Sequence, residues 1–189
     1  MHDIPALAAE LSGIELATDR ALLRQKSRDF YWYSPILKQR LDGKSAELLA
    51  RPKNEDEVLR ILTACRARRV PVTVRGGGTG NYGQCVPLDG GVVLDMTAMN
   101  APIALKDGVV EVETGAKMID LDLWCRERGW ELKLWPSTKR TATIGGFVAG
   151  GGAGVGGISH GTMRERGNLI GARVATMQDP PRVLDLEGL

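Results

Sequence analysis

Residues 70–80, VPVTVRGGGTG, decide the fold, because a run of β-branched residues leads directly into a run of glycines. Valine and threonine favour an extended strand. The glycines lack a Cβ atom, so the backbone can lie close against another group, at an entropic cost of about 0.5–1 kcal/mol for each residue. A second glycine-rich run occupies residues 145–157, and the two runs hold roughly half of the 24 glycines. Such a cost requires a compensating interaction, and a phosphate-bearing cofactor is the leading candidate.

The residues before the first glycine run have a strand–helix–strand pattern. Residues 48–52 predict a short strand, and Asn54 with Glu57 forms a capping-box pattern that opens a helix. Apolar residues then recur at helical spacing through residues 58–65. A second strand at 70–75 follows, so the sequence predicts a small parallel sheet.

The rest of the chain continues this mixture of helices and strands. Residues 4–42 predict helices that break at Gly13, at residues 34–35 and at residues 42–43, and they form a helical N-terminal appendage. Further strands are predicted at 91–96, 109–114, about 169–177 and 182–186, and a helix at 117–128 is expected to end at Gly129. The predicted fold class is α+β, with the glycine clusters as connections.

The composition excludes several classes of protein. With 43% hydrophobic and 25% charged residues, the chain of 189 residues can bury a core. A net charge of +2 without a block of Lys or Arg argues against nucleic-acid binding. The 3 cysteines are irregularly spaced, which predicts reduced thiols, no disulfide and no metal site. We expect a cytoplasmic protein, because the sequence contains no secretory signal and no apolar stretch of about 20 residues that could form a transmembrane segment.

Two matches to the G-x-G-x-x-G pattern, within residues 78–83 and 152–157, resemble a nucleotide-binding fingerprint of the Rossmann type. That fingerprint requires a helix immediately after the turn. Pro87 follows the first match, and residues 158–162 after the second are interpreted as unsuited to a helix, so the Rossmann interpretation fails. Neither loop has the lysine of a Walker A motif. Consecutive glycine N–H groups can instead form a nest that holds a pyrophosphate, with the Thr79 hydroxyl as a further donor.

Structural alternatives remain open for both glycine runs. Residues 76–83 could be only a tight loop between strands. Residues 145–157 could be a buried crossing at which two backbones pack closely.

Several motifs in order resemble the FAD-linked oxidases of the vanillyl-alcohol oxidase and p-cresol methylhydroxylase type. They are Arg51-Pro52 with the helix start after it, residues 70–79, residues 92–96 with Asn100, and residues 113–116, 135–137 and 142–146. The similarity spans about residues 48–187 and is greatest to glycolate oxidase flavoprotein subunits and D-2-hydroxyacid dehydrogenases. The resemblance implies a two-lobed FAD-binding domain after the appendage at 1–45. Residues 46–100 would form a small parallel βαβ lobe, and residues 101–189 a larger, mostly antiparallel lobe. The C-terminal part of the domain and the cap domain of the family would be absent.

The resemblance also implies two groups of cofactor-binding residues. The first contains Arg75, Gly76, Gly77, Gly78, Thr79, Gly80, Asn81, Gly83 and Gln84. The second contains Pro136, Ser137, Thr143, Ile144, Gly145, Gly146, Ala149, Gly150, Gly156, His160 and Gly161. Many relatives attach the flavin through a histidine in the first loop, and this loop has none, so the implied FAD is non-covalent. His160 is interpreted as structural rather than catalytic, and no catalytic residue is assigned.

The resemblance implies the FAD-binding domain of an oxidoreductase that transfers a hydride from an alcohol or 2-hydroxy acid to flavin N5. The substrate half would be missing from this chain, so a partner chain or a homo-oligomer is possible. A second hypothesis is a non-catalytic flavin- or nucleotide-binding module that a partner chain completes. A third is a glycine-rich structural domain without a ligand.

Overall fold

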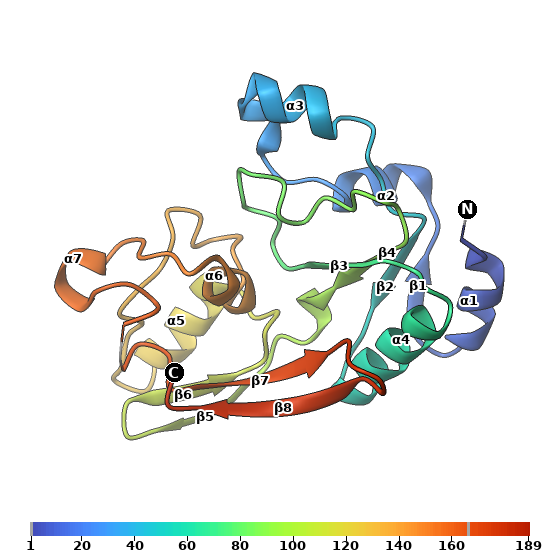
Figure 1. Ribbon diagram of the computed structural model, residues 1–189. Helices are drawn as coiled ribbons and strands as arrows, with labels where there is room; N and C mark the ends of the chain where they lie inside the picture. Colours follow the sequence, from blue (N-terminus) through green and yellow to red (C-terminus); the bar gives the residue numbers. More distant parts are fainter. Residues whose placement is uncertain (1, 166) are drawn as a thin grey trace. The chain divides into compact units, whose positions relative to one another are not determined.

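The computed structural model describes residues 2–165 and 167–189 (Figure 1). The chain divides into two compact units. The first contains Met1–Ala98 and Ala175–Arg182, and the second contains Met99–Val174 and Val183–Leu189. Helices and strands occur in both, so the predicted α+β class is confirmed.

A four-stranded sheet forms the centre of the first unit. Its strands are β1 (Glu15–Ala17), β2 (Leu48–Arg51), β3 (Val72–Arg75) and β4 (Val92–Asp95), in the order β1-β2-β4-β3. Strands β2 and β3 both pair with β4 in parallel, which confirms the predicted parallel sheet, and β1 pairs with β2 in antiparallel. Every residue of β4 is buried, as expected for a central strand with both faces covered.

The α-helices of the first unit begin at polar caps. They are α1 (Ile4–Glu10), α2 (Arg20–Lys26), α3 (Pro35–Leu41) and α4 (Glu55–Ala67). The unit also contains the 3-10 helices η1 (Tyr31–Tyr33) and η2 (Met96–Ala98). In α4 the Asn54 side chain accepts the Glu57 N–H at 2.9 Å, as the capping-box pattern predicts. The Glu57 carboxylate accepts the Lys53 N–H instead of the Asn54 N–H. The predicted apolar face of α4, including Val58 and Ile61, is buried.

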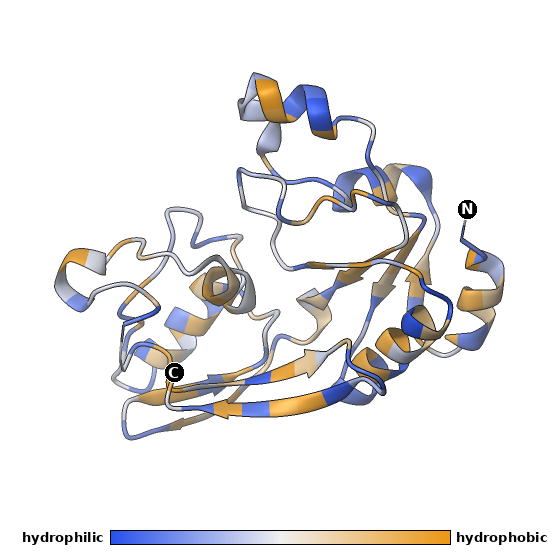
Figure 2. Cartoon of the chain, viewed as in Figure 1, coloured by the Kyte–Doolittle hydropathy of each residue, from blue (hydrophilic) through white to orange (hydrophobic). Residues whose placement is uncertain are grey.

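Strand β1 was not predicted, because three residues are too short to show an alternating pattern. Its pairing with β2 places the segment between α1 and α2 in the sheet of the first unit. In the same unit, Leu23 of α2 packs in a core cluster with Ala46, Leu49 and Val93. Apolar residues accordingly mark much of β2 and β4 in Figure 2.

In the second unit, β5 (Pro102–Lys106) and β6 (Val109–Val112) form an antiparallel hairpin. Exposure alternates along β6, as its sequence predicts, whereas β5 was not predicted. Helix α5 (Met118–Arg126) follows, and Gly129 comes soon after its end with a φ of +80°. Strands β7 (Gly171–Thr176) and β8 (Arg182–Glu187) pair as a two-stranded sheet, and their arrows in Figure 1 run in opposite directions.

Helix α6 overlaps the second glycine run and helix α7 begins at its last residue, where the sequence predicts connections. Helix α6 (Ile144–Gly150) begins at Thr143, whose hydroxyl accepts the Gly146 N–H, and ends at Gly151 with a φ of +60°. Helix α7 (Gly157–His160) is a single turn, so the interpretation that residues 158–162 are unsuited to a helix is wrong at its start. Gly161, with a φ of +76°, ends that turn. Both helices are short enough for caps and packing to override the low helix propensity of glycine.

A cluster of Met118, Leu134, Phe147 and Met163 forms a core in the second unit. Phe147 is the residue of α6 in this core, and Leu134 belongs to the segment between α5 and α6. In the part of the chain that the structure describes, no helix is long and apolar enough to cross a membrane.

Candidate cofactor-binding segments

The first glycine segment, residues 76–84, follows the end of β3. The backbone N–H groups of Gly77, Gly78, Thr79 and Gly80 donate no hydrogen bond to any other described residue. These residues are half-buried. Half-buried donors without a protein partner require water or a ligand, and an anion can accept several of them at once. The segment therefore has the donor set that a phosphate group needs.

Arg75 supplies a permanent positive charge behind this segment. Its side chain is 9% exposed, and Nη1 donates to the carbonyls of Lys26 at 3.0 Å and Arg28 at 2.7 Å. The same nitrogen lies 3.2 Å from the Cys85 sulfur. Among the described residues, Nε has no hydrogen-bond partner, and no carboxylate forms an ion pair with the guanidinium. A guanidinium stays protonated in proteins, so its charge favours an anion nearby.

Gly78 lies directly against this guanidinium. It has a φ of +64°, and a Cβ atom at this position would overlap Nη2 of Arg75. Because two carbonyls hold the Arg75 side chain, it cannot easily move away. The shape of the loop therefore requires glycine at position 78.

The continuation of the segment turns away from the sheet. Asn81 and Gln84 are exposed, and the Gln84 side chain accepts the Tyr82 N–H at 3.2 Å. The Gly83 N–H donates to the Asp29 carboxylate at 2.9 Å. Cys85 is buried, and burial raises the pKa of its thiol despite the lowering effect of the Arg75 guanidinium.

In the second unit, a buried carboxylate holds the segment that contains Pro136 and Ser137. Asp122 of α5 accepts hydrogen bonds from Lys139 Nζ at 2.7 Å, from Arg126 Nε at 2.8 Å and from the Leu132 N–H at 3.0 Å. Burial alone would raise the pKa of Asp122, but the hydrogen bonds from Lys139 and Arg126 lower it to about 2. Lys139 Nζ also lies 4.1 Å from the Trp135 ring centroid, a cation–π geometry. One ionised carboxylate thus fixes residues 132–139 at both ends.

The start of α6 uses its backbone donors within the protein. The N–H groups of Ile144 and Gly145 donate to the carbonyls of Ala116 and Thr114, both at 2.9 Å. A Cβ atom at Gly145 would overlap Thr114 Oγ1, so packing alone requires glycine there. The structural alternative of closely packed backbones therefore applies at Gly145. Gly146, Ala149 and Gly150 are exposed along α6.

Close backbone packing also explains the glycine at position 156. Trp135 and Val155 exchange backbone hydrogen bonds of 3.2 and 2.7 Å. A Cβ atom at Gly156 would overlap the carbonyl of Lys133. His160 is exposed at the end of α7, where its carbonyl accepts from Asn168 Nδ2 at 2.6 Å, and its imidazole has no partner among the described residues.

The two groups of predicted site residues lie in different units. Residues 75–84 belong to the first unit and residues 136–161 to the second. Sequence reasoning missed Asp29 and Asp122, which hold these segments. Asp29 has no motif around it, whereas the spacing of Asp122 to Arg126 is that of a helical ion pair and could have drawn attention to it. Among the described residues, no group of three or more His, Cys, Asp or Glu side chains could hold a metal ion.

Curated relatives of this chain are an oxidase subunit and dehydrogenases. The chain is 33% identical over 116 residues to the glycolate oxidase subunit GlcD of Bacillus subtilis, which covers 60% of the chain and 25% of the relative. It is 31% identical over 131 residues to the mitochondrial D-2-hydroxyglutarate dehydrogenase of Rattus norvegicus, over 68% of the chain and 24% of the relative. The chain thus spans about a quarter of the length of these relatives.

Solved structures show the same fold at low sequence identity. An alkyldihydroxyacetonephosphate synthase matches with a TM-score of 0.82 at 20% identity, over 95% of this chain and 38% of its own. The glucooligosaccharide oxidase of Acremonium strictum, which has a 6-S-cysteinyl, 8α-N1-histidyl FAD, matches with a TM-score of 0.75 at 21% identity. That match covers 96% of this chain and 36% of the oxidase. The predicted two-lobed fold of the p-cresol methylhydroxylase type is confirmed.

The profile of one family matches residues 46–179, which are most of the chain and include both glycine segments. Its description is "FAD binding domain". The open backbone donors of residues 77–80 beside the Arg75 guanidinium suit the diphosphate of that cofactor. The chain belongs to this FAD binding domain family.

Proposed function

We propose that this chain is the FAD-binding part of an oxidoreductase that oxidises an alcohol or a 2-hydroxy acid and holds FAD non-covalently. The observation that carries the proposal is the set of four half-buried N–H groups at residues 77–80 beside the Arg75 guanidinium. The names of the relatives, a glycolate oxidase subunit and a D-2-hydroxyglutarate dehydrogenase, support the substrate class. When bound, the flavin supplies the redox chemistry by accepting a hydride at N5.

The role of this chain is to bind and orient the cofactor. We assign the N–H groups of residues 77–80 and the Thr79 hydroxyl as donors to the pyrophosphate oxygens, with Arg75 as the fixed charge behind them. Pro136, Ser137 and the exposed residues of α6 are the proposed contacts of the second segment. Because the first donors of α6 are used within the protein, we expect that helix to contribute close backbone approach rather than hydrogen bonds.

Two features support non-covalent binding. Residues 76–84 contain no histidine or cysteine. The neighbouring thiol, Cys85, is buried, and its raised pKa keeps it protonated and a poor nucleophile. Acid precipitation of the protein purified with its cofactor tests this point. Yellow colour in the supernatant is the expected result, and a yellow pellet would contradict non-covalent binding.

Replacement of Gly78 tests the binding site itself. The variant Gly78→Val places a branched side chain against Arg75 and beside the open donors, so we expect FAD affinity to fall by at least roughly tenfold, measured by flavin fluorescence titration. The control is Gly13→Val. Gly13 also has a positive φ, of +90°, but a Cβ atom there meets nothing within 4 Å. Unchanged FAD affinity in Gly78→Val would rule out the proposed pyrophosphate site.

A non-catalytic flavin- or nucleotide-binding module is the second candidate. The observation that favours it is that the open donors of residues 77–80 account for binding of a cofactor, whereas no catalytic residue is assigned among the described residues. Anaerobic addition of glycolate, D-lactate and D-2-hydroxyglutarate to the FAD-loaded protein separates the two candidates. Bleaching of the flavin absorbance by one of them supports the oxidoreductase. An oxidised flavin with every acid, alone and with a candidate partner chain, favours the module.

A further inference from the structure

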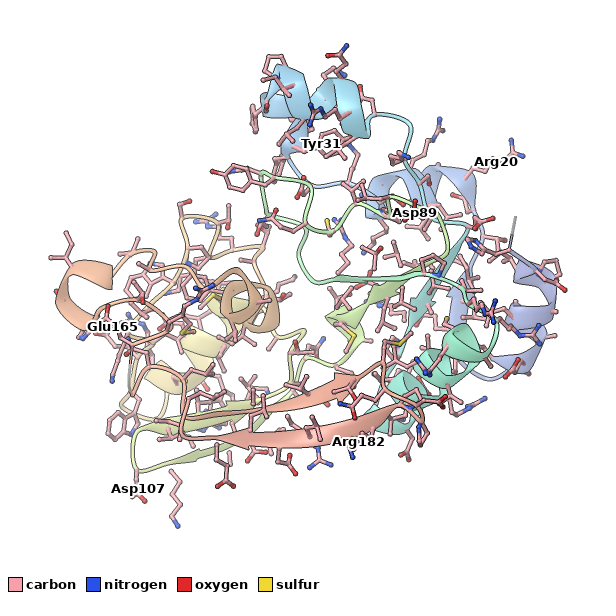
Figure 3. The ribbon with its side chains drawn as sticks, in the orientation of Figure 1. Arg20, Tyr31, Asp89, Asp107, Glu165 and Arg182 are labelled. Atoms are coloured by element: carbon pink, nitrogen blue, oxygen red, sulfur yellow. The ribbon has the colours of Figure 1, made fainter. Side chains whose placement is uncertain are left out.

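A short segment of the first unit, residues 26–31, lies against the first glycine segment. It joins α2 to the base of α3, where Tyr31 is labelled in Figure 3. The Phe30 N–H donates to the carbonyl of Gly80 at 2.9 Å. The Gly83 N–H donates to Asp29 Oδ2 at 2.9 Å. Two adjacent residues thus hold the glycine segment at two points three residues apart.

Asp29 is the centre of this arrangement. It is 5% exposed, and its two carboxylate oxygens have different partners. Oδ1 accepts the Tyr31 N–H at 2.8 Å, which fixes the carboxylate on its own segment, and Oδ2 accepts from Gly83. A buried carboxylate has to be satisfied by donors, so its position restricts where Gly83 can lie.

The same segment is fixed to the ends of the central strands. Arg75, the last residue of β3, donates to the carbonyls of Lys26 and Arg28. Lys26 Nζ forms an ion pair of 2.6 Å with Asp95, the fully buried last residue of β4. Residues 26–31 are therefore connected both to the sheet and to the glycine segment.

We propose that residues 26–31 are a positioning element of the cofactor site, with Asp29 as its positioning residue. The segment accepts from Arg75 before the open donors and holds the Gly80 carbonyl and the Gly83 N–H after them, so the loop is anchored on both sides of residues 77–79. The N–H groups of residues 77–80, which have no partner among the described residues, stay available to an anion. A binding loop held in its bound shape loses less conformational entropy when the ligand binds, and affinity rises accordingly. This inference rests on the proposed function, and it extends the site to residues that precede the family match at 46–179.

The test compares Asp29→Asn with Asp19→Asn. The asparagine at 29 keeps the shape of the side chain but replaces one acceptor oxygen with an NH₂ group, which cannot accept from Gly83 or Tyr31. Asp19 caps α2 through the Leu22 N–H, a role that asparagine fills equally well. We expect Asp29→Asn to weaken FAD binding roughly tenfold and to speed hydrogen exchange at the Gly83 and Phe30 amides, and Asp19→Asn to change neither.

A third variant, Leu7→Ala, distinguishes a loss of FAD affinity that comes from the loop from a loss that comes from lower overall stability. Leu7 is fully buried in α1, which packs against α4, so its truncation is expected to lower the melting temperature of the protein through the core. Below the transition, we expect Leu7→Ala to keep the FAD affinity of the wild type. Should Asp29→Asn fail to fold, Asp29→Glu, which keeps the charge but displaces the oxygens, provides the same comparison.

The outcomes distinguish this inference from the proposed function. Unchanged FAD affinity and unchanged exchange at Gly83 in the Asp29 variant would overturn it, as would an equal loss of affinity in Leu7→Ala. If the wild type itself binds no FAD, the proposed function fails. Exchange in the ligand-free protein then still decides whether Asp29 holds the loop, since faster exchange at Gly83 supports the positioning role and unchanged exchange refutes it.

Discussion

At the scale of single residues, glycine has two different roles in this chain. Gly78 lies against a charged side chain, which already requires glycine, and beside the open backbone donors of the proposed pyrophosphate site. Gly145 is required by Thr114, and Gly156 by the Lys133 carbonyl. The sequence predicts both glycine runs as a cofactor site, because a glycine beside a ligand and a glycine in close internal packing are the same residue in a sequence. The two roles can be distinguished only when the residues that surround each glycine in the folded protein are known.

Asp122 makes the stability of the second unit sensitive to acid. Burial by itself raises its pKa, but the hydrogen bonds from Lys139 and Arg126 lower the pKa in the folded protein to about 2, below the value of about 3.9 for an unfolded chain. The carboxylate therefore stabilises the fold above about pH 4, and this contribution, about 2 kcal/mol, is lost as the pH falls from about 4 to about 2. We expect Asp122→Asn to lower the free energy of urea unfolding at pH 7.

The pH dependence of the free energy of unfolding distinguishes Asp122 from Asp120. Asp122→Asn should flatten the fall in unfolding free energy between about pH 4 and about pH 2, because the titrating group is gone. Asp120→Asn, which changes an exposed carboxylate on the same helix, should leave that fall in place. An equally steep fall in Asp122→Asn and the wild type would show that Asp122 is not the group responsible.

At the scale of helices and strands, sequence patterns predict an element correctly where the residues of that element alone determine its structure. The apolar spacing of α4, its Asn54 cap and the β-branched run of β3 are local features, and the structure confirms both elements. Strand β1 and helix α7 are too short to carry a pattern, and α6 is rich in glycine. These elements depend on pairing, capping and packing with distant residues. Asp29 was missed for the same reason, since its partner Gly83 lies 54 residues away.

Helix α6 allows a test of whether its glycines serve the fold or the cofactor. Gly150 is helical, is exposed and has nothing within 4 Å of a Cβ position, so the fold does not require glycine there. We expect Gly150→Ala to raise the free energy of unfolding by about 0.5–1 kcal/mol through higher helix propensity. If Gly150 approaches FAD as proposed, the same variant should bind FAD less tightly. A variant that is more stable and binds FAD as well as the wild type would remove Gly150 from the site.

At the scale of the whole molecule, each unit holds its candidate cofactor segment with a buried carboxylate from elsewhere in the same unit. Asp29 holds Gly83 of the first unit, and Asp122 holds residues 132 and 139 of the second. Family membership is established by the match at 46–179, yet Asp29 lies outside that range. The family resemblance could therefore predict the cofactor and indicate candidate binding segments. It could not predict the residues that fix their shape.

Binding of FAD should stabilise the whole chain, because a ligand that binds only the folded state adds RT ln(1 + [L]/Kd) to its stability. At a free FAD concentration of 100 times Kd, this amounts to about 2.7 kcal/mol and raises the melting temperature measured by scanning calorimetry. Riboflavin, which has the isoalloxazine ring but no phosphate, tests the part played by residues 77–80. If these N–H groups hold the pyrophosphate, riboflavin at the same concentration should raise the melting temperature far less, and ADP should stabilise the wild type but not Gly78→Val. Equal stabilisation by riboflavin and FAD would mean that the ring, and not the diphosphate, supplies the affinity, and the assignment of the first glycine segment would then be wrong.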